Sequence, residues 1–230
     1  MQALARRSVI IGGNGALGKK VVEVFRDSWE VTSVDFKSNS LAHKNLVLPQ
    51  GSTELHHSFC KENLSGKYDA MICVAGGWVG GNIANPEIFA QTRQMIEINL
   101  YPSLLTCHLA TSFLNENGLI ILTGAASVFK DVTPGNLAYG LAKTAVHSLA
   151  LNMATQESIP NTSVVSTILP EIIDTPSNRA AMPDANFSTW CDPIAIAGLI
   201  KMWAEGNNRP SNGSFAVLKS INGSIVPEFV

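Results

Sequence analysis

The sequence has little charge and few aromatic residues: 15% of its 230 residues are charged, and 7% are Phe, Trp or Tyr. Sixteen basic and eighteen acidic residues give a net charge of -2, and no run rich in Lys or Arg occurs. The electrostatic pattern of nucleic-acid or anionic-membrane binding is therefore missing. No segment has the apolar length of a membrane span, and the apolar run after Arg6 and Arg7 is far shorter than that of a signal peptide. These absences favour a cytosolic location and a small-molecule ligand, with no nucleic-acid or membrane partner.

Cysteine is also scarce. The four cysteines are Cys60, Cys73, Cys107 and Cys191. They show neither C-x-x-C nor Cys/His spacing, which argues against a disulfide framework or a zinc site and indicates buried thiols in a reducing compartment. His108 and His147 fall on predicted helices without metal-ligand partners, and such histidines are more often packing or surface residues than ligands. No metal is therefore expected.

Hydrophobic residues make up 46% of the chain, enough for a large core in a single domain over residues 1–230. Short apolar runs alternate with longer amphipathic ones, which predicts a doubly wound α/β fold with seven parallel strands flanked by helices. Strands are expected at 8–13, 30–35, 45–49, 70–77, 118–124, 162–170 and 214–220. Helices are expected at 16–27, 86–114 with an interruption, 140–157 and 192–205. The segment 171–191 lacks clear periodicity and is interpreted as a substrate loop.

A glycine-rich turn directly follows the first predicted strand and opens the first helix. It reads G-x-G-x-x-G, and with the preceding glycine it comprises Gly12, Gly13, Asn14, Gly15, Ala16, Leu17 and Gly18. Glycines here permit a tight turn, close approach of the backbone to a pyrophosphate, and close packing of the helix on the sheet. The motif alone also fits an ordinary glycine-rich turn, so the prediction of a dinucleotide site depends on its context.

Asp35 provides part of that context because it ends the second predicted strand, where a carboxylate can accept hydrogen bonds from both adenosine ribose hydroxyls. The same charge would repel a 2′-phosphate, so NADH is predicted as the cofactor, with NADPH weaker. Lys37 lies close enough to leave the exclusion of NADPH incomplete. The alternative is a plain solvent-exposed aspartate.

Small residues also follow the fourth predicted strand, as Ala75, Gly76 and Gly77, where open α/β sheets bind ligands. Trp78 comes next, flanked by glycines, and is interpreted as a platform for a flat ligand. A hydrophobic plug over the edge of the sheet would explain it equally well.

Tyr139 and Lys143 are four residues apart near the start of a predicted helix and share one face of it. An ammonium close to a phenol is expected to lower the pKa of that phenol and make it a better proton donor, and the same lysine can hold ribose hydroxyls. The spacing predicts an acid pair tied to the cofactor. It carries weight only because a strand ending at Gly124 and a dinucleotide motif precede it.

These motifs, with Asn99 and the segment from Pro170 to Thr175, resemble the short-chain dehydrogenase/reductase family across the whole chain. The resemblance implies a Rossmann-like fold with Tyr139 as general acid, Lys143 lowering its pKa, Asn99 supporting a water relay and Thr175 at the nicotinamide carboxamide. The family also holds the substrate oxygen with a serine, whose place is taken here by Ala126. The adjacent Ser127 is out of step by one residue, and Glu171 stands where many members have glycine.

The segments CVAGGWVGGN, AYGLAKTAVHSLA, DTPSNRAAMP, FSTW and NRPSNGS resemble the dihydropteridine reductases, which also lack that serine. This resemblance implies NADH-dependent reduction of quinonoid dihydropterin, with Trp78 and Ala126 at the substrate. Asn178 and Trp190 in the long loop either close over the pterin or have a structural role. The wider family implies a homodimer through helices around 94–114 and 140–157, although these residues could also face the core. Two alternatives stay open: a reductase of another small carbonyl or pteridine, and a non-enzymatic NAD(H)-binding sensor.

Overall fold

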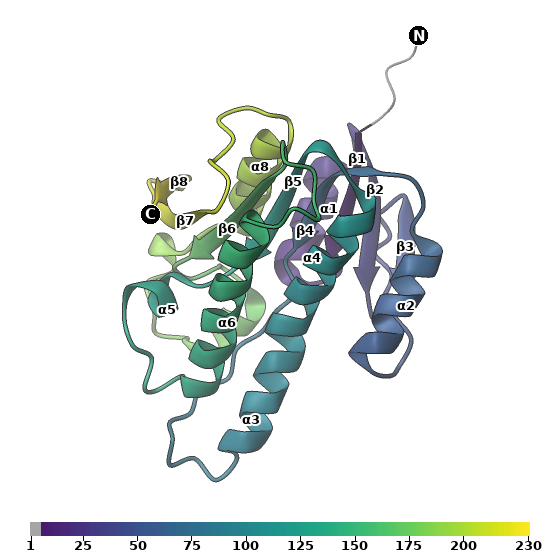
Figure 1. The fold of residues 1–230 in the computed structure, drawn as a ribbon. Helices are drawn as coiled ribbons and strands as arrows, with labels where there is room; N and C mark the ends of the chain where they lie inside the picture. The colour runs from purple at the N-terminus through teal and green to yellow at the C-terminus, as the bar shows by residue number, and fades with distance from the viewer. Residues whose placement is uncertain (1–5) are drawn as a thin grey trace.

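The computed structural model describes residues 6–230, which form helical layers on both faces of a central sheet (Figure 1). The strands are β1 (Arg6–Ile11), β2 (Trp29–Asp35), β3 (Lys44–Val47), β4 (Tyr68–Cys73), β5 (Leu114–Thr123), β6 (Val164–Pro170), β7 (Ser214–Ile221) and β8 (Ser224–Phe229). Their order in the sheet is β3-β2-β1-β4-β5-β6-β7-β8. The proposal of one domain over 1–230 includes residues 1–5, which lie outside the described part.

The helices are α1 (Ala16–Phe25), α2 (Thr53–Asn63), α3 (Ile88–Met95), α4 (Tyr101–Phe113), α5 (Ala126–Lys130), α6 (Leu137–Ala154), α7 (Pro176–Ala181) and α8 (Pro193–Ala204). Two short helical turns accompany them, a π-helical turn at Ile96–Leu100 and a 3-10 turn at Phe187–Thr189. The predicted interruption of 86–114 is this π-helical turn between α3 and α4. Pro193 occupies the first turn of α8, as predicted, and Asp192 caps that helix by accepting a hydrogen bond from Ile194 N–H.

The predicted parallel sheet is confirmed for β1 to β7, each of which pairs in parallel with its neighbours. The prediction of seven strands is wrong by one, because residues 6–230 contain an eighth strand, β8, antiparallel to β7. A two-residue turn at Asn222 and Gly223 joins these strands, and both residues have positive φ, as a type I′ hairpin requires. The Asn-Gly pair was the available signal for this strand.

Two apolar clusters hold the layers together, one on each face of the sheet. On one face α2, α4 and α6 cover Val9, Ile11 and Ile120, and on the other α1 and α8 cover Ile10 and Ile72. Helix α2 was missed in the sequence because it is largely exposed and buries only Cys60 among its residues. The helical pattern of α5 and α7 was missed because each spans less than two turns.

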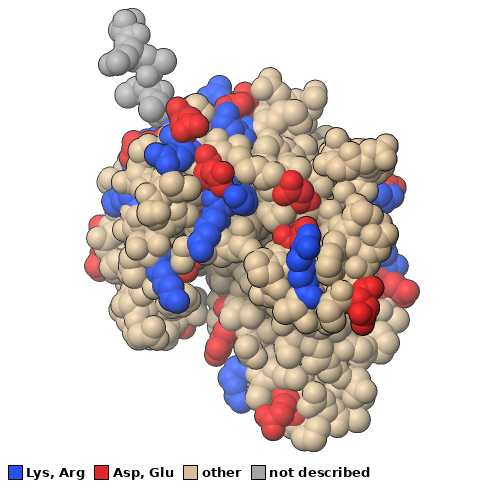
Figure 2. All heavy atoms as spheres, turned by 180° about the vertical axis from the view of Figure 1, so that it is seen from behind, with Lys and Arg blue, Asp and Glu red and all other residues tan. Residues whose placement is uncertain are grey.

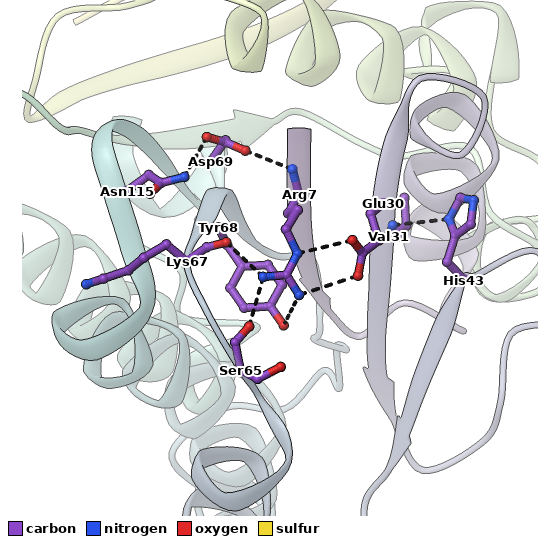
Figure 3. A network of polar contacts seen from close by, with 9 residues as sticks. All are labelled: Arg7, Glu30, Val31, His43, Ser65, Lys67, Tyr68, Asp69 and Asn115. Carbon is purple, nitrogen blue, oxygen red and sulfur yellow. Dashed lines mark hydrogen bonds and ion pairs between the residues drawn. The ribbon is translucent and has the colours of Figure 1, made fainter. Parts of the chain in front are cut away.

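Arg7 links the amino ends of β1, β2 and β4 (Figure 3). Its guanidinium pairs with Glu30 at 3.2 Å and lies 4.3 Å from the ring centroid of Tyr68, while its backbone N–H donates to Asp69 at 2.8 Å. Arg7, one of the two arginines before the first apolar run, thus has a structural role.

The strand order reverses between β1 and β4, since the chain runs outward from β1 to β3 and then crosses back to β4. Crevices at such switch points lie outside the carboxyl ends of the strands and bind ligands in open α/β sheets. The glycine-rich turn after β1 and the small residues after β4 therefore face one another across this point.

Candidate active site

A cleft of about 1340 Å³ opens at the carboxyl ends of β1, β2, β4, β5 and β6. Its walls come from the turn after β1, the segment after β4, the start of α6 and the segment after β6. The face turned away in Figure 1 carries interspersed acidic and basic side chains, and a hollow separates the lobe containing α2 from the tapering lower part (Figure 2). The cleft is therefore lined by residues from segments that are far apart in the sequence.

The turn after β1 forms a cradle that side chains would fill. Gly12 has a φ of +84°, and a Cβ there would lie 2.5 Å from the backbone nitrogen of Ala75. A Cβ on Gly18 would lie 1.9 Å from the carbonyl oxygen of Gly12, so that glycine lets α1 pack against the turn. Gly12, Gly15, Ala16 and Leu17 line the cleft, whereas Gly13, Asn14 and Gly18 are not among its lining residues. The cradle fits the pyrophosphate of a dinucleotide at the amino end of α1.

Asp35 lies at the end of β2 and lines the cleft beside this cradle. One of its carboxylate oxygens accepts a hydrogen bond from Asn14 N–H at 2.9 Å, which ties the carboxylate to the phosphate turn. The remaining acceptor capacity fits ribose hydroxyls. Asn14 therefore acts through its backbone on Asp35 and not through direct lining of the cleft.

The sequence analysis named no residues for the part of the cleft beyond Asp35. The structure places five residues there: Phe36, Leu48, Ser52, Glu54 and His56. The rings of Phe36 and His56 meet edge to face with centroids 5.3 Å apart. Phe36 and Leu48 directly follow β2 and β3, and their position after two adjacent parallel strands was the signal that could have found them. The other three residues belong to α2 and its N-cap, Ser52. Together the five residues offer a surface for a flat base.

Tyr139 and Lys143 lie on the first two turns of α6, and both line the cleft. Lys143 is 3% exposed, donates to the carbonyl of Thr123 at 2.8 Å, and has its nitrogen 5.8 Å from the Tyr139 ring centroid. Burial raises the pKa of Tyr139 to about 12 and lowers the pKa of Lys143 to about 8. Burial is the cause of the Tyr139 shift, and the lowering of the tyrosine pKa by Lys143 stays a prediction. At neutral pH Tyr139 is protonated.

Asn99 lies in the π-helical turn and holds the segment after β4. Its side-chain oxygen accepts from Gly77 N–H at 3.2 Å, and its amide donates to the carbonyls of Gly77 at 3.1 Å and Met95 at 3.0 Å. A Cβ on Gly76 would lie 2.7 Å from that oxygen, which explains the glycine there. π-Helical turns occur often at functional sites, and this one points Asn99 at the backbone that carries Trp78.

Trp78 is 48% exposed and lines the cleft, so the interpretation as a hydrophobic plug does not fit its position. The segment after it is joined to the loop before α6: Gly81 N–H donates to Gly135 at 2.8 Å, and Leu137 N–H donates to Gly81 at 3.0 Å. Trp78 and Tyr139 therefore stand on backbone segments that are hydrogen-bonded to each other.

Two predicted substrate residues lie away from the cleft. Ala126 is 1% exposed and belongs to the apolar cluster under α4 and α6, whereas the adjacent Ser127 is exposed and lines the cleft. The turn into α5 rotates these neighbours to opposite sides, which spacing from Tyr139 could not reveal. Trp190 is 5% exposed and packs against Phe187 with centroids 4.7 Å apart, so it is a structural residue of the long loop.

The loop 171–191 does border the cleft, through Glu171 at its start, next to Pro170 at the end of β6, and through Thr175 and Asn178 at the amino end of α7. Thr175 caps α7 by accepting from Asn178 N–H, and the Asn178 amide donates to the carbonyl of Ile173 at 2.8 Å. These bonds occupy part of the Asn178 side chain locally. The segment thus contains a folded turn of helix at the cleft wall.

All four cysteines are buried, as predicted. Among the described residues, no group of three or more His, Cys, Asp or Glu side chains is arranged to hold a metal ion. In the same part of the chain, no helix has the length and apolar character needed to cross a membrane.

His147 gives a testable pH dependence of stability. Burial lowers its pKa to about 4 in the folded protein, against an ordinary value of 6.5. Both states hold a neutral imidazole above pH 6.5, but as the pH falls toward 4 only the unfolded chain gains the proton, so this stability is lost on acidification. Between pH 7 and about pH 4.5 the loss is about 2 kcal/mol. Urea unfolding should show that the free energy of unfolding of wild type falls toward that of His147→Gln by this amount over the same pH range. An unchanged difference between the two proteins would contradict the lowered pKa of His147.

The comparisons with known proteins agree with this geometry. A family model described as enoyl-(acyl carrier protein) reductase matches residues 54–198. A dihydropteridine reductase of Dictyostelium discoideum is 36% identical over 216 residues, covering 92% of this chain and 93% of the relative. A solved short-chain dehydrogenase/reductase from Serratia marcescens has a TM-score of 0.78 at 17% identity, covering 94% of this chain and 97% of that one. A 4-hydroxyisoleucine dehydrogenase complexed with NADH has a TM-score of 0.73 at 21% identity, covering 95% and 97%.

The doubly wound sheet, its phosphate cradle and the family match define an NAD(P)H-dependent oxidoreductase. The family model spans more than half of the chain, and the Dictyostelium relative spans nearly all of it. The chain belongs to the short-chain dehydrogenase/reductase family.

Proposed function

We propose that this enzyme reduces a quinonoid dihydropterin to the tetrahydropterin with NADH, and so recycles a tetrahydrobiopterin-type cofactor. The observation that carries the proposal is the extended likeness to the Dictyostelium dihydropteridine reductase. The cleft supports it physically, because it combines a dinucleotide cradle with a half-exposed indole and a protonated phenol.

The reaction consumes the quinonoid dihydropterin, one NADH and one proton, and yields the tetrahydropterin and NAD⁺. NADH supplies the hydride when it is bound. Tyr139 donates the proton, and its raised pKa keeps the hydroxyl protonated at neutral pH. A flat conjugated ring can stack on the Trp78 indole. Asn99 hydrogen-bonds the backbone of the preceding residue, Gly77.

Lys143 has two roles in this proposal. Its charged nitrogen is fixed at the carbonyl of Thr123 and has further donors for the nicotinamide-ribose hydroxyls. Its pKa of about 8 leaves most of it charged at pH 7 yet allows it to return a proton to Tyr139 after turnover. The cofactor and the acid are thereby held by one helix.

The missing serine fits this substrate class. Reduction of a quinonoid dihydropterin restores an aromatic pyrimidine, so the acceptor needs less polarisation than an isolated ketone. A ketone reductase would depend more heavily on a hydroxyl at the substrate oxygen. Ser127 does present a hydroxyl to the cleft, however, so the substrate panel described below, and not the alanine at position 126, decides between a pterin and a small carbonyl substrate.

Ala126→Ser is expected to give less than about twofold gain in kcat/KM, because position 126 is buried and a hydroxyl there would be desolvated and not presented to the substrate. Initial rates with the quinonoid pterin test this. Ser127→Ala is the matched variant on the exposed side of the same turn, and we expect it to raise the KM for the pterin. A large gain for Ala126→Ser would contradict the explanation of the missing serine.

Asp35→Ala is expected to shift cofactor preference from NADH toward NADPH by about tenfold or more. The variant loses charge-assisted hydrogen bonds to the ribose and also the repulsion of a 2′-phosphate. The ratio of kcat/KM values for NADH and NADPH measures the effect, and Asp192→Ala, at the cap of α8, serves as control. An unchanged ratio would mean that Asp35 does not meet the adenosine ribose.

We also propose a homodimer through α4 and α6 in the cytosol. Leu104, Leu141 and Leu151 are exposed apolar side chains on these helices, and burying them against a second copy would remove their surface from water. Sedimentation at micromolar concentration tests the dimer, and Leu104→Lys with Leu141→Lys should yield monomer.

A substrate panel tests the proposed function against its alternatives. Purified enzyme with NADH is offered a freshly generated quinonoid 6-methyl-dihydropterin and a set of ketones and aldehydes. We expect a clear preference for the pterin. Preference for a ketone would favour a carbonyl reductase, and NADH binding without turnover on any of these would favour a sensor.

A further inference from the structure

His147 lies behind the reacting residues and has no part in the chemistry above. It is placed one helical turn after Lys143 on α6, and both side chains reach the end of β5. Lys143 donates to the carbonyl of Thr123, and two residues later Ala125 N–H donates to Nε2 of His147 at 3.2 Å. Helix α6 thus binds two backbone groups of the segment that leads to Ser127: the carbonyl of Thr123 and the N–H of Ala125.

The contact between ring and turn is close. A Cβ on Gly124 would lie 2.3 Å from Nε2 of His147, so only glycine leaves space for the imidazole. Phe129 and Phe215 enclose the ring with centroids at 5.9 Å and 5.5 Å. The side chain is 9% exposed, and its position is fixed by packing on these sides.

The hydrogen bond also fixes the chemical state of the ring. Because Nε2 accepts from a backbone N–H, the imidazole is neutral and carries its proton on Nδ1. Burial and the nearby Lys143 charge keep the pKa of His147 low, which agrees with an acceptor role. A protonated ring would present a second donor to the Ala125 N–H.

We propose that His147 is a positioning residue that sets the turn 124–127, so that Ser127 faces the cleft while Ala126 stays in the core. It acts through the backbone N–H of Ala125 and does not touch the substrate. The turn 124–127 borders the cleft away from the phosphate cradle, which is built on β1 and α1. A disturbed turn should therefore change substrate binding and not NADH binding. The choice of pterin as the assay substrate rests on the proposed function.

Two matched variants distinguish the hydrogen bond that His147 accepts from the packing of its ring. His147→Phe keeps a ring of similar size between Phe129 and Phe215 but leaves the Ala125 N–H without a partner, whereas His147→Gln can offer an oxygen to it. We expect His147→Phe to raise the KM for the quinonoid pterin about tenfold while the Kd of NADH changes less than about twofold. His147→Gln should recover most of that loss. Equal defects in both variants, or a parallel loss of NADH affinity, would overturn the proposal.

A measurement on the wild type does not depend on turnover. Long-range ¹H–¹⁵N spectra of the histidine rings report the tautomer, and the signal that disappears in His147→Gln belongs to His147. We expect a neutral ring protonated on Nδ1, and a ring protonated on Nε2 would overturn the proposal. If wild type fails to reduce the pterin but shows the expected tautomer, the proposed function fails while the anchoring of the turn stands.

Discussion

Replacement of Tyr139 by Phe is expected to lower kcat for the quinonoid pterin by about 10²- to 10⁴-fold, the range typical of a lost general acid. The variant lacks only the hydroxyl, so the ring can keep its place on α6 beside Lys143. Burial keeps the pKa of Tyr139 at about 12, so the wild-type hydroxyl is protonated throughout the neutral range and available as donor.

NADH titration followed by fluorescence should give nearly the same Kd for Tyr139→Phe and wild type, because the phosphate cradle lies elsewhere. Tyr101→Phe is the matched control, since Tyr101 also lines the cleft but stands on α4. Full activity of Tyr139→Phe would remove the tyrosine from the mechanism. A similar loss in Tyr101→Phe would point to a general disturbance of the cleft.

Lys143→Met is expected to lower kcat/KM by about 10²-fold or more and to weaken NADH binding, because one nitrogen is proposed to serve both the acid and the ribose. Methionine keeps much of the volume in a position that is almost fully buried. Steady-state kinetics and NADH titration check both effects. Lys130→Met, at an exposed ion pair with Glu171, is the control and should retain activity.

The pH profile sharpens this test. Burial lowers the pKa of Lys143 to about 8, so the charged form is populated below that pH and is lost above it. Wild-type kcat should therefore fall as the pH rises through about 8, and the variant should lack this limb. The same alkaline limb in Lys143→Met would assign it to another group.

The sequence predicted the sheet well because its strands are buried on both faces and read as continuous apolar runs. It also predicted the glycine-rich turn after β1, because a Cβ on Gly12, Gly13 or Gly18 would clash with neighbouring atoms. The edge strand β8 was not predicted because most of its residues are exposed and it contains Pro227, so only the Asn-Gly turn before it distinguished it.

Local rotation of the chain limited the prediction of the site. Ala126 and Ser127 differ by one position in the sequence, yet one lies in the core and the other lines the cleft. Trp190 was expected either to close over the pterin or to have a structural role, and it packs on Phe187. Trp78 was interpreted as a platform for a flat ligand and does line the cleft, so side-chain size alone did not decide between the two tryptophans.

The Tyr139 and Lys143 pair shows a limit of another kind. Spacing places the two residues on one helix face, but the sign of a pKa shift depends on burial as well as on neighbouring charge. Here burial raises the tyrosine pKa and lowers the lysine pKa. A phenol that stays protonated is still suited to donate a proton.

The most direct test of the proposed reaction is the stoichiometry of NADH oxidation with freshly generated quinonoid 6-methyl-dihydropterin. Absorbance follows NADH, chromatography quantifies the tetrahydropterin, and the rate without enzyme is subtracted. We expect enzyme-dependent formation of one tetrahydropterin for each NADH consumed. Absence of enzyme-dependent tetrahydropterin, with NADH still bound by the protein, would contradict the assignment of quinonoid dihydropterin as substrate.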